Sequence, residues 1–429
     1  MTGAPRPDAD GVRKTVLPNG LRVLSETIPQ FSSVTLGIWV EAGSRYEHAD
    51  QNGISHFLEH LFFKGTERRT ALQIAQEIDA VGGVLNAFTD REYTCFHAKV
   101  LREDLPLAFD VLSDVFLHAK FPEDEVERER TVVLAEIAEG EDSPDHYVHI
   151  LFDLGFWPGD ALARPIAGTT ETVSRLQRDD FTRFVAERYR PDRVVIAAAG
   201  AIEHEWLVEQ VARQFGSLSG SAARPEFTSP RANLTLRMHP KELEQVQMLI
   251  GIPGLPKTDP RRYAAFVLNT ILGDGMSSRL FQEIREKRGL AYSVSSFLAS
   301  FHEAGYLAIY AGLGAEAVRE ALDVVREQVR ALREKGLSDE ELARAKSQIK
   351  GSMLLSLESS GSRMSRMAVN DIYYGRQITP VEVAASISAV THDDIRALAR
   401  ELFDVDRMAV TLLGDVDGHG IDESAALLG

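Results

Sequence analysis

The chain of 429 residues contains a single cysteine, Cys95. One cysteine excludes internal disulfide bonds and a cysteine-based zinc site, and it suits a reducing cytoplasm, where we expect the protein to reside. No apolar run reaches the roughly 18 residues that a membrane span requires. Basic residues are also few, since 47 Lys and Arg oppose 64 Asp and Glu and the net charge is −17. This charge argues against nucleic acid or an anionic membrane as a partner.

The length exceeds one ordinary hydrophobic core and predicts two domains of about 200 residues, with three or four smaller domains as the alternative. Hydrophobic residues make up 44% and charged residues 26% of the sequence. This balance is typical of a soluble globular protein.

The two halves of the sequence resemble each other. Ala108-Phe109-Asp110-Val111 and Ala321-Leu322-Asp323-Val324 each begin a long helical run, and short apolar strand candidates end at Gly200 and Gly414. The offsets (108 to 321 and 200 to 414) are 213 and 214 residues, about half the chain. A stretch rich in Gly, Ser and Pro separates the halves. We therefore predict a first domain over 1–218, a linker over 219–232 and a second domain of the same fold over 233–429.

Strands and helices alternate in pairs along the first half. Period-two patterns predict strands, and helical spacing of apolar residues predicts helices. The expected strands are 21–27, 33–41, 84–88 and 94–100, and the expected helices are 53–63, 72–81, 105–117 and 124–137. This order predicts an α+β class, in which each domain has an antiparallel sheet with helices on one face.

The five residues His56-Phe57-Leu58-Glu59-His60 lie within the first expected helix. Histidines at i and i+4 project from one face of a helix and can share a tetrahedral cation. Glu59 lies about a third of a turn away, where it can act on a water at the metal without binding the metal itself. The pattern is H-x-x-E-H, the inverted zinc hydrolase motif. Alone, it also fits a helix with two histidines that face solvent or core.

A zinc ion held by two histidines usually takes a carboxylate as its third ligand. In the helix expected over 124–137, Val126, Val133 and Ile137 form an apolar stripe, and Glu129 and Glu136 lie together at its edge. Burying such glutamates requires a cation or hydrogen-bond donors nearby. Geometry alone fits an exposed acidic edge equally well.

Together, the H-x-x-E-H motif and Glu136, 76 residues after His60, resemble the zinc-binding pattern of the pitrilysin family, which includes insulin-degrading enzyme and the mitochondrial processing peptidase. The likeness spans nearly the whole chain and is nearest to the bacterial half-length, single-chain members. The further segments that carry it are Leu17-Pro18-Asn19-Gly20-Leu21, Gly53-Ile54-Ser55, Phe63-Lys64-Gly65-Thr66, Asn86-Ala87-Phe88-Thr89, Ser278-Arg279-Leu280-Phe281 and Arg288-Gly289-Leu290-Ala291-Tyr292.

The resemblance implies a role for each matching residue. His56, His60 and Glu136 are expected to bind one Zn²⁺ per chain, with Glu59 as the general base. Glu129 is expected to orient a histidine through its second ring nitrogen. Four further matching residues concern the substrate. Asn86 and Ala87 fall on the expected edge strand that receives a peptide backbone. Arg285 and Tyr292 match the family's Arg–Tyr pair of the second half, which can donate to an oxyanion.

Taken together, these features predict a zinc endopeptidase that cleaves peptides or unfolded segments within a closed chamber. Because one chain carries both the ligands and the Arg–Tyr pair, we expect a homodimer in which the zinc domain of one copy faces the second domain of its partner. Relatives of this fold also serve as scaffold subunits after losing their ligands, so a scaffold is one alternative, and an active subunit in a mixed dimer with an inactive partner is the other. The acidic residues over 139–145 have no assigned role.

Overall fold

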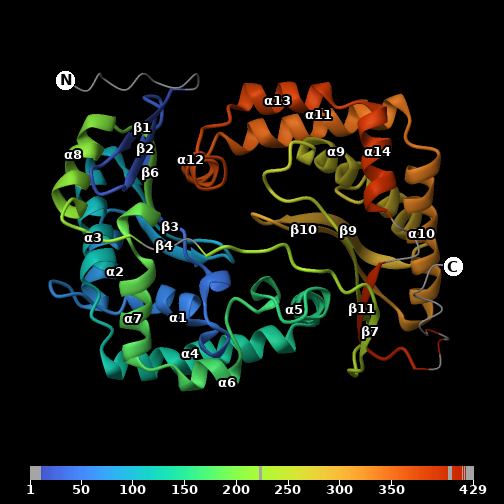
Figure 1. Ribbon diagram of the computed structural model, residues 1–429, viewed down its shortest axis with the longest axis horizontal. Coiled ribbons are helices and arrows are strands. Elements are labelled where there is room, and N and C mark those ends of the chain that lie inside the picture. Colours follow the sequence, from blue (N-terminus) through green and yellow to red (C-terminus); the bar gives the residue numbers. More distant parts are fainter. Residues whose placement is uncertain (1–10, 222–224, 404–407, 418, 420, 422–429) are drawn as a thin grey trace. The chain divides into compact units, whose positions relative to one another are not determined.

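The computed structural model describes residues 11–221, 225–403, 408–417, 419 and 421. Its contacts divide the chain into two compact units (Figure 1). Unit 1 comprises Met1–Ala138, Arg164–Glu226 and Ser356–Thr379, and unit 2 comprises Glu139–Ala163, Phe227–Leu355 and Pro380–Gly429. Each unit therefore takes segments from both halves of the sequence.

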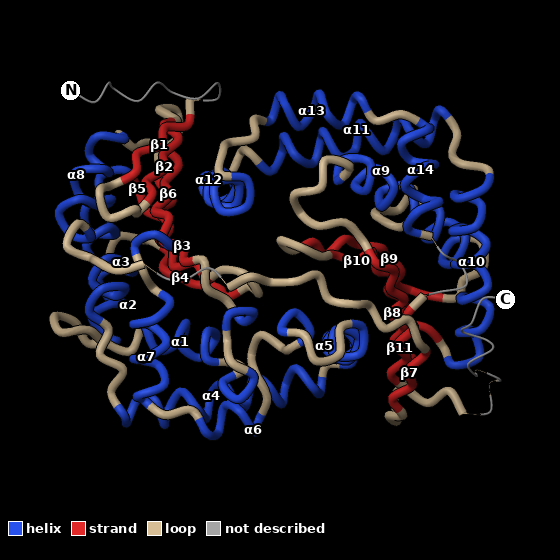
Figure 2. The backbone as a smooth tube through the Cα atoms, viewed as in Figure 1, coloured by secondary structure: helices blue, strands red, loops and turns tan. Residues whose placement is uncertain are grey.

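Among the described residues, each unit contains one sheet (Figure 2). The five strands of the second sheet follow the same order as the five strands after β1 in the first sheet, and β1 has no counterpart. The strand order is β1-β2-β6-β3-β5-β4 in unit 1 and β7-β11-β8-β10-β9 in unit 2. Each sheet has one parallel pair, which is β2 with β6 inside the first sheet and β7 with β11 at an edge of the second, and the other pairs are antiparallel. The strands are β1 (Val12–Val16), β2 (Arg22–Thr27), β3 (Ser33–Val40), β4 (Val84–Thr89), β5 (Thr94–Leu101), β6 (Val194–Gly200), β7 (Leu236–His239), β8 (Val246–Pro253), β9 (Ala291–Ser300), β10 (Gly305–Leu313) and β11 (Ala409–Leu413).

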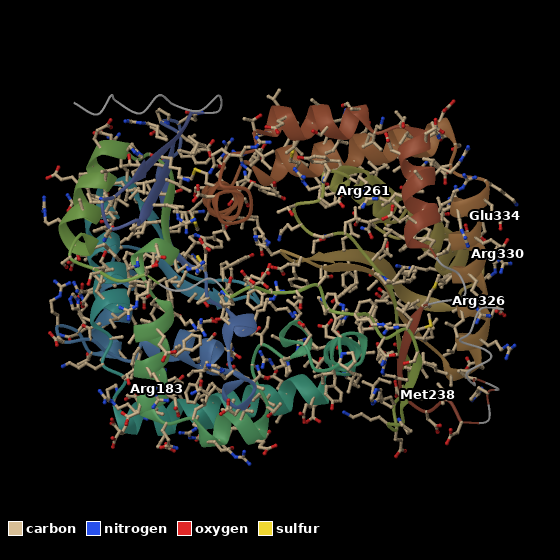
Figure 3. All side chains as sticks on the ribbon, in the orientation of Figure 1. Arg183, Met238, Arg261, Arg326, Arg330 and Glu334 are labelled. Carbon is tan, nitrogen blue, oxygen red and sulfur yellow. The ribbon has the colours of Figure 1, made fainter. Side chains whose placement is uncertain are left out.

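Helices connect the strands in both units, and none within the described residues is long and apolar enough to cross a bilayer. The α-helices are α1 (Ile54–Phe62), α2 (Ala71–Asp79), α3 (Leu105–His118), α4 (Glu123–Asp142), α5 (Pro144–Phe156), α6 (Thr170–Arg175), α7 (Arg178–Arg188), α8 (His204–Phe215), α9 (Arg262–Leu272), α10 (Val318–Glu334), α11 (Asp339–Ser356), α12 (Ser360–Tyr374), α13 (Pro380–Ala389) and α14 (His392–Leu402). A π-helical segment, Phe281–Glu286, precedes β9. Helix α10 is clearly amphipathic, because its valines face the core while Arg330 and Glu334 are exposed (Figure 3).

Alternation along the central strands produces two apolar faces on each sheet. In β3, Leu36 and Ile38 join the core formed with α1 and α3, whereas Trp39 points to the opposite face. Strand β8 repeats the arrangement, since Ile250 packs with α9 and α10 and Leu249 packs on the other side. Strands that are apolar on both faces require a covering layer on both sides.

The second face of each sheet is covered by a helix from the other half of the sequence. Helix α12 packs on the first sheet at Gly37, where an added Cβ would lie 2.7 Å from the Met364 sulfur. Helix α5 packs on the second sheet at Gly251, where an added Cβ would lie 2.1 Å from Phe152. The two glycines are 214 residues apart, which is also the offset between Gly200 and Gly414. We call α12 and α5 the exchanged helices.

The predicted α+β class with two homologous units is confirmed. Two features differ from the expectation, because each sheet contains one parallel pair and helices cover both faces. The expected domains, 1–218 and 233–429, are contiguous, whereas the contacts assign 139–163 to unit 2 and 356–379 to unit 1. Residues 222–224 of the expected linker lie outside the described residues.

Buried ion pairs attach α12 to the first sheet. The fully buried carboxylate of Asp371 accepts hydrogen bonds from Lys14 and, at 3.2 Å, from Arg22. Replacing Asp371 with Asn should lower the free energy of unfolding by about 3 kcal/mol, because Lys14 would lose its counterion and Arg22 would keep only Glu41. Chemical denaturation measures this change. The control is Glu171→Gln, which removes the exposed Glu171–Arg175 pair and should have no measurable effect. Equal effects of the two variants would show that the buried ion pairs of Asp371 do not stabilise the fold more than an exposed pair does.

Candidate metal centre

Helix α1 presents its polar side chains on one side because its other side is anchored in the core. Ile54, Phe57, Leu58 and Leu61 are fully buried and follow the i, i+3, i+4, i+7 pattern of an apolar stripe. His56, Glu59 and His60 are only partly buried. The ring centroids of the two histidines lie 4.9 Å apart. The packing of α1 therefore directs both imidazoles to one side of the helix.

Helix α4 brings the third side chain to the histidines. Val126 and Val133 bury its apolar stripe, and Arg130 donates to the carbonyl of Leu176 at 2.7 Å, which fixes the helix along its length. Glu136 Oε2 then lies 3.6 Å from His56 Nε2 and 3.5 Å from His60 Nε2.

The spacing of these atoms suits a small tetrahedral cation. Bonds of about 2.0–2.2 Å to zinc place neighbouring ligand atoms about 3.3–3.6 Å apart. The distances from Glu136 Oε2 to His56 Nε2 and to His60 Nε2 lie in this range. One ligand atom from each of His56, His60 and Glu136 lies within 4.8 Å of the others. In the described part of the chain, no other group of three or more His, Cys, Asp or Glu side chains converges in this way. Two nitrogen donors and one carboxylate form the ligand set of catalytic zinc sites, which leaves one position open.

Glu129 supports His60 from behind. Its Oε2 lies 3.2 Å from His60 Nδ1, and its Oε1 lies 2.5 Å from Lys64 Nζ. A hydrogen bond donated by Nδ1 leaves the lone pair of His60 Nε2 free for a metal. The ammonium group of Lys64 compensates the charge of the Glu129 side chain, which is only 5% exposed.

The Glu59 carboxylate is held from the neighbouring strand β4. Thr89 donates its hydroxyl proton to Glu59 Oε2 at 2.8 Å. Strand β4 is an edge of the first sheet and pairs only with β5 among the described strands. Asn86 and Ala87 lie on this edge strand, where the Asn86 side chain is exposed and Ala87 is buried.

Burial sets the protonation of the site. It lowers the pKa of His56 to about 4, with a further contribution from the positive charge of His60. His56 Nδ1 is also buried and has no hydrogen-bond partner among the described residues. Burial raises the pKa of Glu59, while the hydrogen bond from Thr89 opposes this shift. At neutral pH the His56 imidazole is therefore uncharged and can bind a metal.

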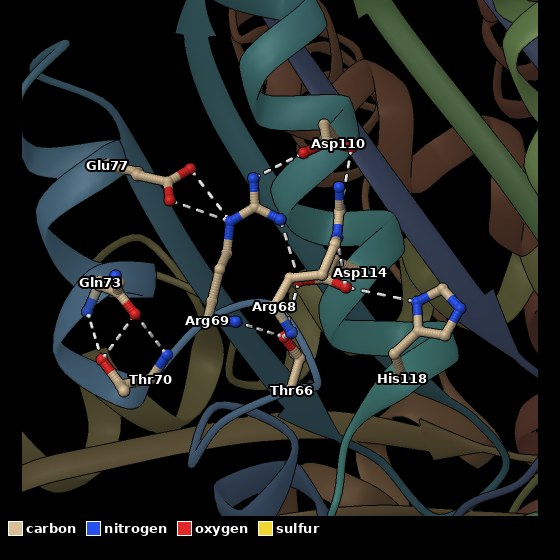
Figure 4. Close-up of polar contacts among 9 residues, drawn as sticks. All are labelled: Thr66, Arg68, Arg69, Thr70, Gln73, Glu77, Asp110, Asp114 and His118. Carbon is tan, nitrogen blue, oxygen red and sulfur yellow. Dashed lines mark hydrogen bonds and ion pairs between the residues drawn. The ribbon is translucent and has the colours of Figure 1, made fainter.

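A polar network fixes the segment that follows α1 (Figure 4). Thr66 donates to Asp114 of α3 at 2.7 Å, and Arg68 and Arg69 donate to the same buried carboxylate at 3.0 and 2.9 Å. Burial alone would raise the pKa of Asp114, but these three hydrogen bonds outweigh it and the pKa is lowered. The charged carboxylate therefore ties the end of the ligand helix to α3.

In unit 2, Arg285 and Tyr292 lie next to each other. The Arg285 guanidinium carbon lies 4.8 Å from the centroid of the Tyr292 ring and 4.8 Å from that of Phe281. Tyr292 is 79% exposed, so it is not a core residue of β9. Helix α11 begins 216 residues after α4 (Asp339 against Glu123), so buried Ala345 and exposed Ser352 stand where α4 has Glu129 and Glu136.

Two histidines and a glutamate around one point, on one of two repeated α+β units, define a metallopeptidase-like protein. The family models agree with this class. Residues 22–170 match the insulinase (peptidase family M16) model, and residues 175–349 match the peptidase M16 inactive domain model. The chain belongs to peptidase family M16, the pitrilysin family, as a half-length member that resembles processing peptidases.

Curated relatives and solved structures agree with this membership. An uncharacterized zinc protease of Streptomyces coelicolor is 45% identical over 91% of this chain and 87% of its own length. An uncharacterized zinc protease of Bacillus subtilis is 40% identical over 92% of this chain and 96% of its own length. The fold is similar to a peptidase M16 inactive domain from Pseudomonas fluorescens (TM-score 0.88, 20% identity, 94% of this chain and 97% of that one). It is also similar to a chain of complex III2 from Candida albicans, with a TM-score of 0.84 and 23% identity over 97% of this chain and 99% of that one.

Sequence reasoning missed Thr89 and Lys64 as contacts of the site. Both stand in segments that carry the family resemblance, Asn86-Ala87-Phe88-Thr89 and Phe63-Lys64-Gly65-Thr66. Their roles depend on how α1 lies against β4 and α4, which the local pattern does not specify.

The buried imidazole of His56 should make the stability of the metal-free protein depend on pH. The unfolded chain binds a proton at His56 near pH 6.5, whereas the folded chain binds it only near pH 4. Over this window the unfolded state holds more protons, so stability should fall as the pH drops from 6.5 to 4. At about 1.4 kcal/mol per pKa unit, the loss is roughly 3 kcal/mol.

Urea unfolding with chelator present, at a series of pH values, measures this loss against His56→Gln, which cannot titrate. A difference between the two proteins that stays constant from pH 6.5 to 4 would show that the imidazole is freely protonated in the fold.

Proposed function

We propose that this protein is a zinc-dependent endopeptidase that cleaves peptides or unfolded segments. The observation that carries the proposal is the convergence of His56, His60 and Glu136 at spacings that suit tetrahedral zinc, with Glu59 on the next turn of the same helix. The names of the relatives, zinc proteases, support the same class.

His56, His60 and Glu136 would hold one zinc ion per chain. Bound zinc supplies a Lewis acid that polarises the scissile carbonyl and acidifies water. The Glu59 carboxylate accepts the proton of the attacking water and then delivers it to the leaving amine as the peptide bond breaks. Thr89 holds this carboxylate in place, and partial burial favours its return to the protonated state. Glu129 fixes the ring of His60 throughout.

Strand β4 would bind the substrate backbone. Its outer edge is open among the described strands, and Thr89 at its end contacts Glu59. An extended peptide can pair with such an edge through main-chain hydrogen bonds that require little side-chain specificity. We assign Asn86 and Ala87 to this contact. A peptide bound here would be extended, so flexible chains are favoured over folded proteins.

Arg285 and Tyr292 would stabilise the oxyanion of the tetrahedral intermediate. The guanidinium and the phenol are both hydrogen-bond donors, and the exposed Tyr292 can reach a ligand. We assign them to the zinc site of a second copy in a homodimer that encloses the substrate.

The alternative function is a scaffold subunit of the same fold, or an active subunit paired with an inactive partner. A scaffold has no need of metal ligands, and the full set of His56, Glu59, His60 and Glu136 in this chain weighs against it. Metal analysis of the purified protein separates the enzyme from a scaffold, because a scaffold would bind no zinc. Peptide cleavage by the purified single chain would argue against an obligate inactive partner.

Replacing Glu59 with Gln should leave one zinc per chain and lower turnover of a fluorogenic peptide by about 10²–10⁴-fold, since the proton acceptor is lost. His60→Ala serves as the matched control and should lose both zinc and activity. The wild-type activity should disappear with chelator and return with zinc. Near-normal cleavage by the Glu59→Gln variant would remove Glu59 from its role.

Mixing two inactive variants tests whether the site is shared between copies. Glu59→Gln and Tyr292→Phe each impair every site of their own homodimer. If Tyr292 acts on the partner's zinc, a mixed dimer contains one fully intact site. Half of the dimers are mixed after random exchange, and one of their two sites is intact, so activity should return to about a quarter of wild type. No recovery in a mixture proven to exchange subunits would contradict sharing.

A further inference from the structure

The N-terminus of the ligand helix α1 lacks an ordinary cap. The first N–H groups of a helix have no partner within it and usually bond to the side chain of the N-cap residue. Here the N-cap is Gly53, with φ of +97°. A side chain there is excluded by space as well, because an added Cβ would lie 2.6 Å from the carbonyl oxygen of Ala167. Any cap for α1 must come from another part of the chain.

The carboxylate of Glu47 takes this place. Its Oε2 accepts hydrogen bonds from the main-chain N–H of Gly53 and from the side chain of Asn52, both at 2.9 Å, and its Oε1 accepts from the N–H of Ser55 at 2.9 Å. Ser55 is the second residue of α1 and directly precedes His56. Glu47 is 5% exposed, so the carboxylate meets these donors in the interior.

The loop that carries Glu47 is itself tied down. Arg164 donates to the main-chain oxygen of Glu47 at 2.9 Å, and Thr172 donates to that of Asn52 at 2.7 Å. Asn52 also donates to the carbonyl of Pro165 at 2.9 Å. These contacts fix the main chain of Glu47 and the neighbouring residue Asn52. The Glu47 carboxylate is therefore a fixed hydrogen-bond acceptor for the N-terminus of α1.

The metal centre depends on this end of the helix. Helix α1 has nine residues, and His56 is in its first turn, where an uncapped helix frays first. Burial raises the pKa of Glu47 to about 7, although the hydrogen bonds from Asn52, Ser55 and Gly53 lower it. Burial of a charged carboxylate costs free energy, so hydrophobic packing does not account for a glutamate at position 47.

We infer that Glu47 is a positioning residue of the metal centre, whose buried carboxylate replaces the missing cap of α1 and holds His56 in register with His60 and Glu136. It does not contact the metal. The inference rests on the proposed function only in taking zinc as the metal.

The test measures zinc affinity with the metal alone, by competition with a chromogenic chelator. Glu47→Gln keeps the size of the side chain but turns an N–H donor toward the donors of α1. We expect zinc to bind at least about tenfold more weakly, the range found for residues that orient metal ligands. The midpoint of thermal unfolding should also fall by a few degrees.

The control is Thr70→Ala, which removes the N-cap of α2. Helix α2 has the same length, belongs to the same unit and carries no ligand, and Thr70 accepts the N–H of Gln73 as its cap. This variant should lower the unfolding midpoint while leaving zinc affinity unchanged. Should Glu47→Gln not fold, Asn52→Ala removes one donor from the same carboxylate, and it should weaken zinc binding in the same direction.

Equal zinc affinity of wild type and Glu47→Gln overturns the inference. So does unchanged affinity of Asn52→Ala where Glu47→Gln does not fold, or an equal loss of affinity in Thr70→Ala. Failure of the proposed function has a separate signature, because the wild-type protein itself would then bind no zinc.

Discussion

The apolar stripe of α1 is the constraint on which the candidate site depends. Phe57, Leu58 and Leu61 fix the rotation of the helix against the first sheet, and this rotation leaves only one side for the two histidines. Helix α4 meets that side because its own valines are buried in the same core. The candidate ligands His56, His60 and Glu136 thus converge through the hydrophobic packing of the helices that carry them.

Polar residues around this core form hydrogen bonds and ion pairs with the side chains of α1 and with the segment that follows it. Lys64 and Glu129 lie behind His60, Thr89 holds Glu59, and Asp114 binds the segment that follows the helix. Each is a charged or hydroxyl group paired within the fold, as polar groups at such depth must be. A short helix is in this way held in place along its whole length.

The sequence predicted the local part of this arrangement and missed most of the tertiary part. The spacing of His56 and His60 follows from helical geometry, whereas Glu136 was chosen among 64 acids through the family resemblance. The central strands and helices were predicted within a few residues of their bounds, because their patterns repeat at short range. The exchange of α5 and α12 was not predicted, since an apolar stripe shows that a helix is buried but not which sheet buries it.

Because α5 and α12 are exchanged, each half of the chain contributes a helix to the other half's sheet and receives one on its own. Gly37 and Gly251 lie on β3 and β8, which hold the same place in the two sheets, and each receives a bulky side chain from the opposite half. A half-chain on its own would expose the apolar face of its sheet that α12 or α5 covers in the full chain. Two identical halves could bury this face if each placed its own helix on the sheet of the other. Either half of the chain, expressed alone, would for this reason be more stable as a reciprocal pair than as a lone molecule.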